Sequence, residues 1–127
     1  MICPCNISRS YSECCGLIHK SIFNAKTAEQ LMRSRYSAFV LDDMNYLKLS
    51  HSTLTINTFN FKSVSNWTKK VKWLKLEILA IENGCENDVK GYVEFKAFFL
   101  EKGIIDFIHG HSRFIKENNH WVYLDEI

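Results

Sequence analysis

The chain has 127 residues and is 46% hydrophobic and 13% aromatic, which is enough for one packed domain and excludes intrinsic disorder. Its 16 basic and 14 acidic residues leave a formal net charge of +2, too small to favour nucleic acid as a partner. No stretch approaches the roughly 20 apolar residues of a membrane-spanning helix, and the first residues lack the pattern of a secretory signal. We therefore expect a cytoplasmic protein without a membrane partner.

Four of the five cysteines lie within the first fifteen residues: Cys3, Cys5, Cys14 and Cys15. Because four thiolates fill the tetrahedral shell of zinc, this cluster predicts one structural Zn²⁺ with no open position for catalysis. His19 is a possible substitute ligand. Buried free thiols and a Cys14–Cys15 disulfide are the alternatives. Cys85 stands apart and is typical of an ordinary core or surface thiol.

Helical signals dominate the next part of the chain. Thr27 followed by Gln30 forms a capping box, and the apolar spacing after it predicts a helix over residues 28–41. Asp42 or Asp43 can cap a short second helix that carries Met44 and Leu47. Apolar residues at helical spacing predict a third helix that ends near Lys70, namely Phe61, Val64, Trp67 and Val71.

The second half is typical of strands. Runs that begin near Trp73, Val89, Ile104 and His120 are separated by turn-forming residues, and this pattern predicts an antiparallel meander of about four strands. Helices followed by strands indicate an α+β fold, with the helices packed on one face of a curved sheet. Alternation along the second strand directs an all-apolar set toward the helices: Val93, Phe95, Ala97 and Phe99.

Arg35 lies on the apolar face of the first predicted helix, where a buried guanidinium needs a carboxylate or carbonyl partner. The candidate carboxylates are Glu94, Asp106 and Asp125. A structural ion pair is the plainer interpretation, and ligand binding is the alternative.

We also expect a mainly apolar pocket between the helices and the sheet, because a strongly curved sheet does not always fill its concave side. Arg35 is a candidate ligand-binding residue there, and Tyr36 and His51 could supply polar groups at its rim. A fully packed core is the alternative.

Two further patterns favour rival functions. His109, His111 and Arg113 share one face of the third strand, and a histidine oriented by Asp106 could act as a general base, although such histidines can equally face solvent. A lysine-rich stretch with interleaved aromatic residues could contact RNA, but a solvated helix end is the more ordinary explanation. This stretch contains Trp67, Lys69, Lys70, Lys72, Trp73 and Lys75.

Two stretches resemble known family motifs. The four cysteines with Pro4, Tyr11 and Gly16 resemble the SEC-C motif, the zinc knuckle at the tail of the preprotein-translocase ATPase. The run LMRSRYSAF, residues 31–39, resembles the hallmark of the YchJ-like family. Further matches to that family are His51, Trp73, the triplet Ser112-Arg113-Phe114, Trp121, Tyr123 and Asp125.

The sequence departs from the family pattern at two places. Residues 6–8 replace a glycine-rich loop, and Asn6 can adopt a left-handed turn there. A second SEC-C motif, which many members carry near the C-terminus, is missing before Ile127, so we do not expect a function that needs two knuckles.

The resemblance implies a SEC-C zinc knuckle over residues 1–20 and an NTF2-like domain over residues 21–127, a cone of helices and curved sheet around a pocket. We therefore expect a zinc-binding binding or adaptor module, monomeric or homodimeric, whose partner is an unidentified protein or small molecule. The rivals are a small-molecule enzyme with a histidine base and a ribosome- or RNA-associated module.

Overall fold

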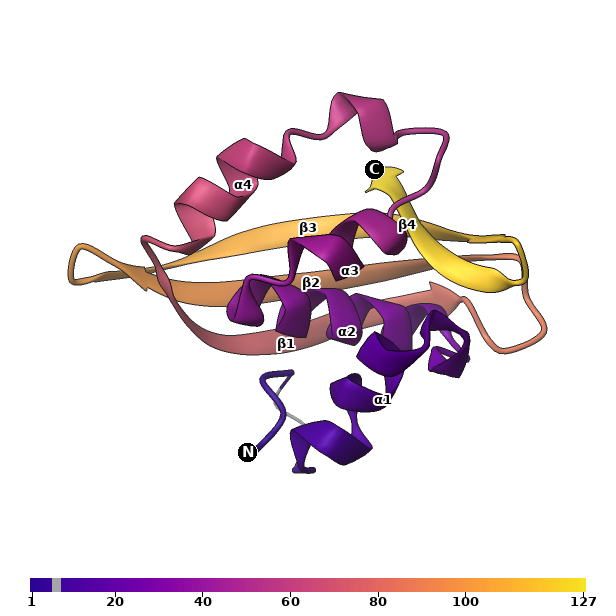
Figure 1. Cartoon of the computed structure of the whole chain (residues 1–127), viewed down its shortest axis with the longest axis horizontal. Coiled ribbons are helices and arrows are strands. Elements are labelled where there is room, and N and C mark those ends of the chain that lie inside the picture. Colours follow the sequence, from indigo (N-terminus) through magenta and orange to yellow (C-terminus); the bar gives the residue numbers. More distant parts are fainter. Residues whose placement is uncertain (6–7) are drawn as a thin grey trace.

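The computed structural model describes residues 1–5 and 8–127 and has the predicted α+β architecture. A helical layer is followed by an antiparallel sheet with strand order β1-β2-β3-β4 (Figure 1). Asn6, for which the sequence allowed a left-handed turn, lies outside the described residues together with Ile7. None of the described helices is long and apolar enough to cross a membrane.

Within the described residues the α-helices are α1 (Cys15–Lys20), α2 (Ala28–Leu41), α3 (Met44–Leu49) and α4 (Phe61–Thr68). Short 3-10 helices cover Tyr11–Glu13, Ile22–Asn24 and Ile56–Thr58. The strands are β1 (Lys72–Asn83), β2 (Lys90–Glu101), β3 (Ile104–Glu117) and β4 (His120–Glu126).

The caps of α2 and α3 explain where these helices begin. Thr27 accepts a hydrogen bond from the backbone N–H of Gln30 at 3.1 Å, and the Gln30 side chain reaches back to the N–H of Lys26 at 2.7 Å. This pattern is a capping box in which the Gln30 side chain accepts from the N–H of Lys26, one residue before the Thr27 cap, instead of from the cap itself. Asp43 accepts from the N–H of Tyr46 at 3.1 Å at the start of α3. The predicted bounds of α2 are thus confirmed, and α3 begins as predicted.

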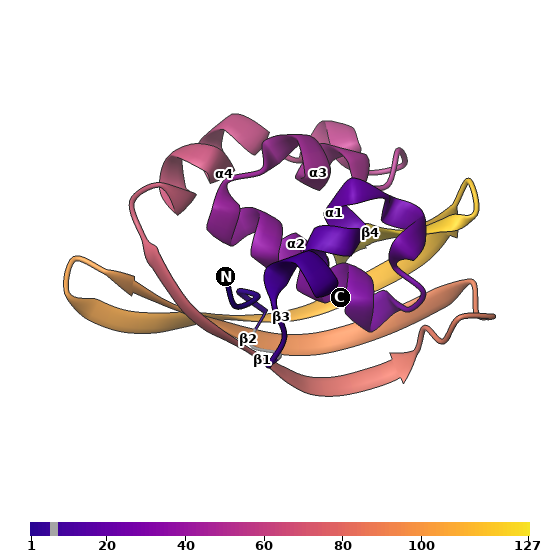
Figure 2. The same ribbon diagram turned by 60° about the horizontal axis from the view of Figure 1, so that its bottom comes forward.

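Helix α2 is buried on more than one side, because it lies between the N-terminal segment and the sheet. Its buried residues are Ala28, Leu31, Met32, Ser34, Arg35, Tyr36, Ser37 and Ala38. Figure 2 shows the N-terminal segment and α1 on the outside of this helix. Ile18 and Ile22 belong to the same buried cluster as Leu31 and Trp121. The boundary at residues 20 and 21 remains a prediction.

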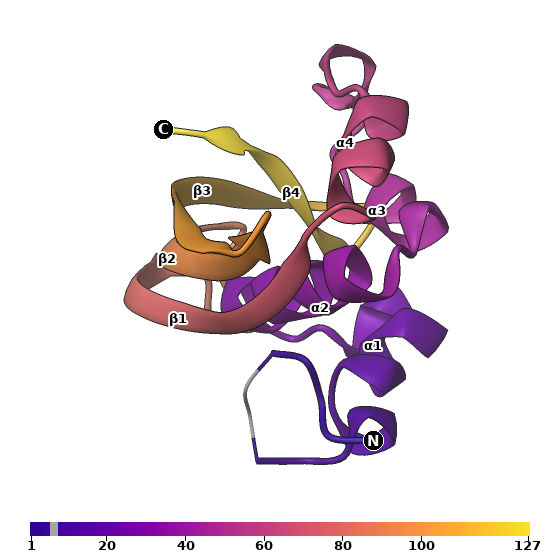
Figure 3. The ribbon, with the colours of Figure 1, turned by 90° about the vertical axis from the view of Figure 1, so that its left-hand side faces the viewer.

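The sheet curves around the other side of the helical layer (Figure 3). The predicted inward set of β2 is confirmed, because Val93, Phe95, Ala97 and Phe99 are all buried. Phe95 pairs with Gly110 on β3, and a Cβ atom at Gly110 would lie 2.5 Å from Cζ of the Phe95 ring. Gly110 therefore makes room for an aromatic ring on the concave face.

Candidate metal centre and ligand cavity

The N-terminal segment folds back on itself and carries the cysteines to one place. The N–H of Cys3 donates to the carbonyl of Arg9 at 2.9 Å, and the N–H of Tyr11 donates to the carbonyl of Met1 at 2.8 Å. Cys14 and Cys15 follow directly, at the start of α1. These backbone bonds bring two sequence-distant cysteine pairs together.

The four sulfur atoms converge. The Sγ atoms of Cys3, Cys5, Cys14 and Cys15 all lie within 4.8 Å of one another, and those of Cys5 and Cys14 are 3.7 Å apart. Tetrahedral zinc with Zn–S bonds of about 2.3 Å requires sulfur–sulfur distances of about 3.8 Å. All four cysteines are free thiols, so the alternative of a Cys14–Cys15 disulfide is wrong. The residues therefore fit a tetrahedral metal ion.

Burial keeps the thiols of this cluster neutral in the absence of a cation. Desolvation, with hydrogen bonding to Cys3 and the charge of Cys5, raises the pKa of Cys14 to about 12. Hydrogen bonding to Cys5 and burial raise the pKa of Cys15 even further. Without a cation these thiols stay protonated, whereas a bound metal ion would lower their pKa and release protons.

Polar contacts attach the cysteine cluster to α2. The Sγ of Cys3 lies 3.7 Å from the hydroxyl of Ser37, and Arg33 donates to the carbonyl of Cys5 at 2.8 Å.

Glycine is required at the start of α1. A Cβ atom at Gly16 would lie 2.6 Å from the carbonyl oxygen of Tyr11, so only glycine allows α1 to approach this carbonyl so closely.

His19 braces the cluster instead of serving as a ligand. Its Nε2 donates to the carbonyl of Ser34 at 2.8 Å, and its Nδ1 accepts from the hydroxyl of Tyr11 at 2.6 Å. Both ring nitrogens are thus engaged, so the prediction of a substitute ligand is wrong. Cys85 is an exposed free thiol, which agrees with the prediction of a surface thiol and not with that of a core thiol.

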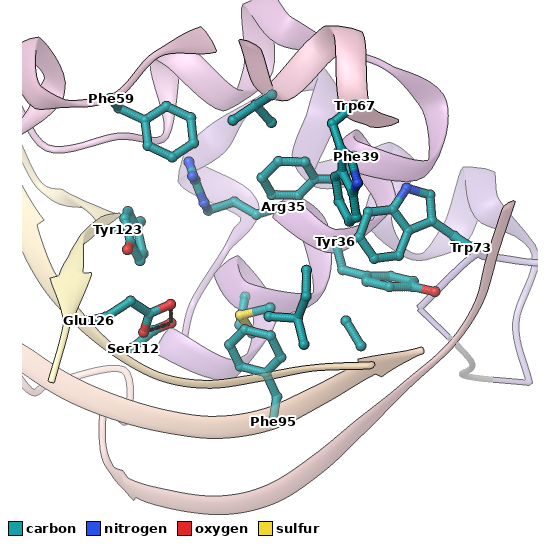
Figure 4. Close-up of a pocket in the computed structure, with 14 residues that line it drawn as sticks. Arg35, Tyr36, Phe39, Phe59, Trp67, Trp73, Phe95, Ser112, Tyr123 and Glu126 are labelled. Atoms are coloured by element: carbon teal, nitrogen blue, oxygen red, sulfur yellow. Dashed lines mark hydrogen bonds between the residues drawn. The ribbon is translucent and has the colours of Figure 1, made fainter. Parts of the chain in front are cut away.

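A cavity of about 330 Å³ lies between the helices and the concave face of the sheet (Figure 4). Its aromatic and aliphatic lining consists of Met32, Tyr36, Phe39, Phe59, Val64, Trp67, Trp73, Phe95, Ala97, Ile108 and Tyr123. The remaining lining residues are Arg35, Ser112 and Glu126. This volume falls at the lower end of the range for small-molecule sites. Ligand binding in the cavity remains a prediction.

Arg35 is buried, but the predicted carboxylates are not its partners. Its Nη1 donates to the carbonyl of Leu47 at 2.9 Å and to the hydroxyl of Ser50 at 2.7 Å. The carboxylate predictions are wrong because those groups are held elsewhere: Glu94 by His109, Asp106 by the N–H of Phe107, and Asp125 by Arg113. Burial lowers the pKa of Arg35 to about 10.

Tyr36 and His51 differ in their relation to the cavity. Tyr36 lines it and packs edge-to-face on Trp73, with ring centroids 5.7 Å apart. His51 does not line it, contrary to the prediction, and is packed among Phe59, Phe61 and Tyr123. Its Nδ1 is buried without a hydrogen-bond partner, and burial followed by the charge of Arg35 lowers its pKa to about 4. His51 is therefore a neutral core residue.

The histidines on which the rival enzymatic function depends lie outside the cavity. His109 and His111 are exposed on β3, whereas the alternate residues Gly110, Ser112 and Phe114 are buried. Strand alternation thus places both histidines on the face away from the helices.

In the lysine-rich stretch, Trp67 and Trp73 pack against each other in the cavity wall, with ring centroids 5.5 Å apart. Their rings are thus part of the cavity instead of forming a stacking surface beside the lysines. Lys69 pairs with Asp42 at 3.6 Å.

Sequence reasoning missed the polar pair Ser112 and Glu126. The Ser112 hydroxyl contacts both carboxylate oxygens of Glu126, at 3.0 and 2.9 Å (Figure 4). The signal that could have found Ser112 is the alternation on β3, where it shares a face with Ile108, Gly110 and Phe114. Glu126 offered no such signal, because it lies at the end of β4.

Sequence comparison shows similarity to the YchJ-like family over most of this chain. The family model described as YchJ, middle NTF2-like domain, matches residues 27–126. A UPF0225 protein of Vibrio parahaemolyticus is 38% identical over 123 residues, which cover 97% of this chain and 72% of the relative. A UPF0225 protein of Bordetella pertussis is 41% identical over 125 residues, covering 97% of this chain and 90% of the relative.

Two solved structures have the same fold. The solution structure of a SEC-C motif containing protein from Rhodopseudomonas palustris is similar with a TM-score of 0.88 and 28% identity, and the match covers 100% of this chain and 98% of the other. The crystal structure of a SEC-C motif containing protein from Psychrobacter arcticus is similar with a TM-score of 0.82 and 31% identity, covering 98% and 81%.

Proposed function

This chain belongs to the YchJ-like family, and from that premise we propose that it is a small-molecule-binding module whose N-terminal segment is held by a structural zinc ion. The observation that carries the binding function is the aromatic-lined cavity of about 330 Å³. The zinc knuckle stabilises the layer that covers α2, and the cavity lies on the other side of that helix.

Zinc is the metal that the donor set favours. Four cysteine sulfurs within 4.8 Å of one another match the closed tetrahedral sites of structural zinc. Because the protein supplies all four ligands, the metal has no position for a substrate or a reactive water. Free thiols of this kind persist in a reducing compartment, which supports a cytoplasmic location.

The composition of the cavity favours binding over catalysis. None of the residues that line it is a histidine, cysteine or lysine, and its one carboxylate, on Glu126, already accepts from Ser112. A general base needs a partner that orients it and a proton within reach. The lining offers an apolar surface with a few polar groups, which is the usual composition of a ligand site.

Metal analysis of protein purified without chelator tests the zinc site. We expect one zinc ion per chain. Less than about a tenth of an equivalent, with no uptake of added zinc by the reduced protein, would contradict the proposal, because closed four-thiolate sites bind zinc tightly.

A pair of alanine variants tests the cavity. Ala97 lines the cavity, whereas Ala80 on β1 is exposed. Ala97→Leu adds volume inside the cavity and should weaken binding of the neutral probe 2-naphthamide, measured by calorimetry. Ala80→Leu is the matched control and should bind as the unmodified chain does. Equal binding by both variants would place the probe outside the cavity.

A further inference from the structure

The positive charge of Arg35 is buried and forms no direct ion pair with a described carboxylate, although the nearby charge of Glu126 acts to raise its pKa. The side chain is 4% exposed, and none of the ion pairs among the described residues includes it. It contacts the last carbonyls of α3 through Leu47, the hydroxyl of Ser50, and the ring of Tyr123 at 4.8 Å. These dipoles stabilise a cation only partly, whereas a buried charge is fully compensated by an opposite charge.

One edge of the guanidinium group has no protein partner. The two hydrogens of Nη1 are used by Leu47 and Ser50, and no described residue accepts a hydrogen bond from Nε or Nη2. The buried side-chain nitrogens without a partner, among the described residues, are on His51 and Trp73. The Nε and Nη2 atoms of Arg35 are therefore open to a small molecule, and the residue lines the cavity.

Arg113 shows which kind of group the Nε and Nη2 edge of an arginine binds in this chain. Arg113 donates from Nε to Oδ1 of Asp125 at 2.6 Å and from Nη2 to Oδ2 at 2.5 Å. This is the side-on, two-bond geometry in which arginine recognises a carboxylate. The same edge of Arg35 is free, and Figure 4 shows the side chain reaching between Phe59 and Tyr123.

Glu126 is the charged group that could compete for this role. Its carboxylate accepts from the Ser112 hydroxyl and forms no ion pair with Arg35. Glu126 is exposed as a whole residue at the end of β4, but burial of its carboxyl group raises the pKa of that group and so weakens its negative charge. Arg35, in contrast, is deeply buried, and its free donors gain most from an anion.

We infer that the cavity binds an organic carboxylate, with the carboxylate on the Nε and Nη2 edge of Arg35 and an apolar, ring-containing body against the aromatic wall. The wall that receives the body is formed by Phe39, Phe59, Trp67, Trp73 and Phe95. This inference rests on the proposed function, because it names the class of ligand for the same cavity.

A matched pair of probes tests the inference on the full chain with its metal. 2-Naphthoate and 2-naphthamide have the same ring system and differ in charge. We expect calorimetry to show that the carboxylate binds at least about tenfold more tightly, as charge-assisted hydrogen bonds of this kind provide. Arg35→Met should abolish this preference. Arg113→Met, which removes an arginine from the outer face, should retain it.

A measurement on the unmodified chain makes the test independent of the folding of any variant. The Nε–H resonance of Arg35 should move further downfield when 2-naphthoate is added than when 2-naphthamide is added. Equal affinity for the two probes, or no larger downfield shift with the carboxylate, would overturn the inference and leave the proposed function standing. Tighter binding of 1-naphthylmethylammonium would overturn it in favour of Glu126. Failure of all the probes to bind would overturn the proposed function as well.

Discussion

Replacing Gly110 with alanine tests the contact that shapes the sheet side of the cavity. The new Cβ atom would lie 2.5 Å from Cζ and 2.6 Å from Cε1 of Phe95, whereas carbon atoms in contact are normally about 3.5–4.0 Å apart. The ring must therefore move by about 1 Å. Oε1 of Glu126 lies 3.3 Å from the same position, so the new methyl group is also confined by that carboxylate.

The expected cost follows from two opposing effects. Overpacking of this kind costs about 1–3 kcal/mol, while alanine is favoured over glycine in a strand by about 0.5–1 kcal/mol. The difference between the two effects spans about 0–2.5 kcal/mol. Because the contact would be as short as 2.5 Å, we expect Gly110→Ala to lower the free energy of unfolding by about 1–2 kcal/mol within that range, measured by urea denaturation. The melting temperature should fall by roughly 3–8 °C. Binding of 2-naphthoate should weaken, because the displaced Phe95 ring lines the cavity.

A double-mutant cycle provides the control. Phe95→Leu removes the ring atoms that clash, so Gly110→Ala should cost less in that background than in the unmodified chain. The same loss of stability in both backgrounds would refute this reasoning, because the cost would then arise from the β3 backbone and not from the ring.

Three further predictions concern stability. Arg35→Met should cost about 1–3 kcal/mol in urea denaturation, because two hydrogen bonds from a charged group are lost while a buried charge without an ion-pair partner is removed. A loss above about 3 kcal/mol would indicate a broken buried ion pair. Chelation of the metal should increase hydrogen exchange in residues 1–20 and leave β2 protected, and loss of protection in β2 would contradict a purely local knuckle. The pKa of His51 is lowered to about 4 in the folded chain, so the unfolded chain takes up the proton first as the pH falls below about 6.5. Stability should thus fall by about 2 kcal/mol from pH 7 to pH 5, and His51→Gln should reduce that difference; an unchanged difference would show that another group titrates.

The secondary structure could be predicted because its signals are local. The hydroxyl of Thr27 and the amide of Gln30 are three residues apart, and together they fix the start of α2 before any tertiary contact forms. The turns at residues 83–84, 102–103 and 118–119 likewise consist of residues that adopt positive φ angles in the structure. Alternation then assigns the faces of β2, because one buried face requires it.

The partners of Arg35 could not be predicted, because they depend on how α3 is placed. The Leu47 carbonyl is free to accept from Arg35 only at the C-terminal end of a short helix, and the sequence does not show which carbonyl will face the guanidinium. His51 was misplaced for a similar reason. Its ring is covered by Phe59, in the irregular segment before α4, and by Phe61, the first residue of α4, and the sequence does not show how that helix is placed against His51.

The burial of α2 on several sides has a consequence for how this sequence can change over time. Ser37 is completely buried against the N-terminal segment and Ser34 against Tyr46 of α3, while Arg35 and Tyr36 line the cavity. Consecutive positions are thus constrained by different neighbours. The helix therefore has few solvent-exposed sites at which a substitution would disturb no packed neighbour. A saturation library over residues 31–39 should therefore yield few functional variants. Such a segment would diverge slowly and retain a dense local signature long after the exposed strands have lost theirs.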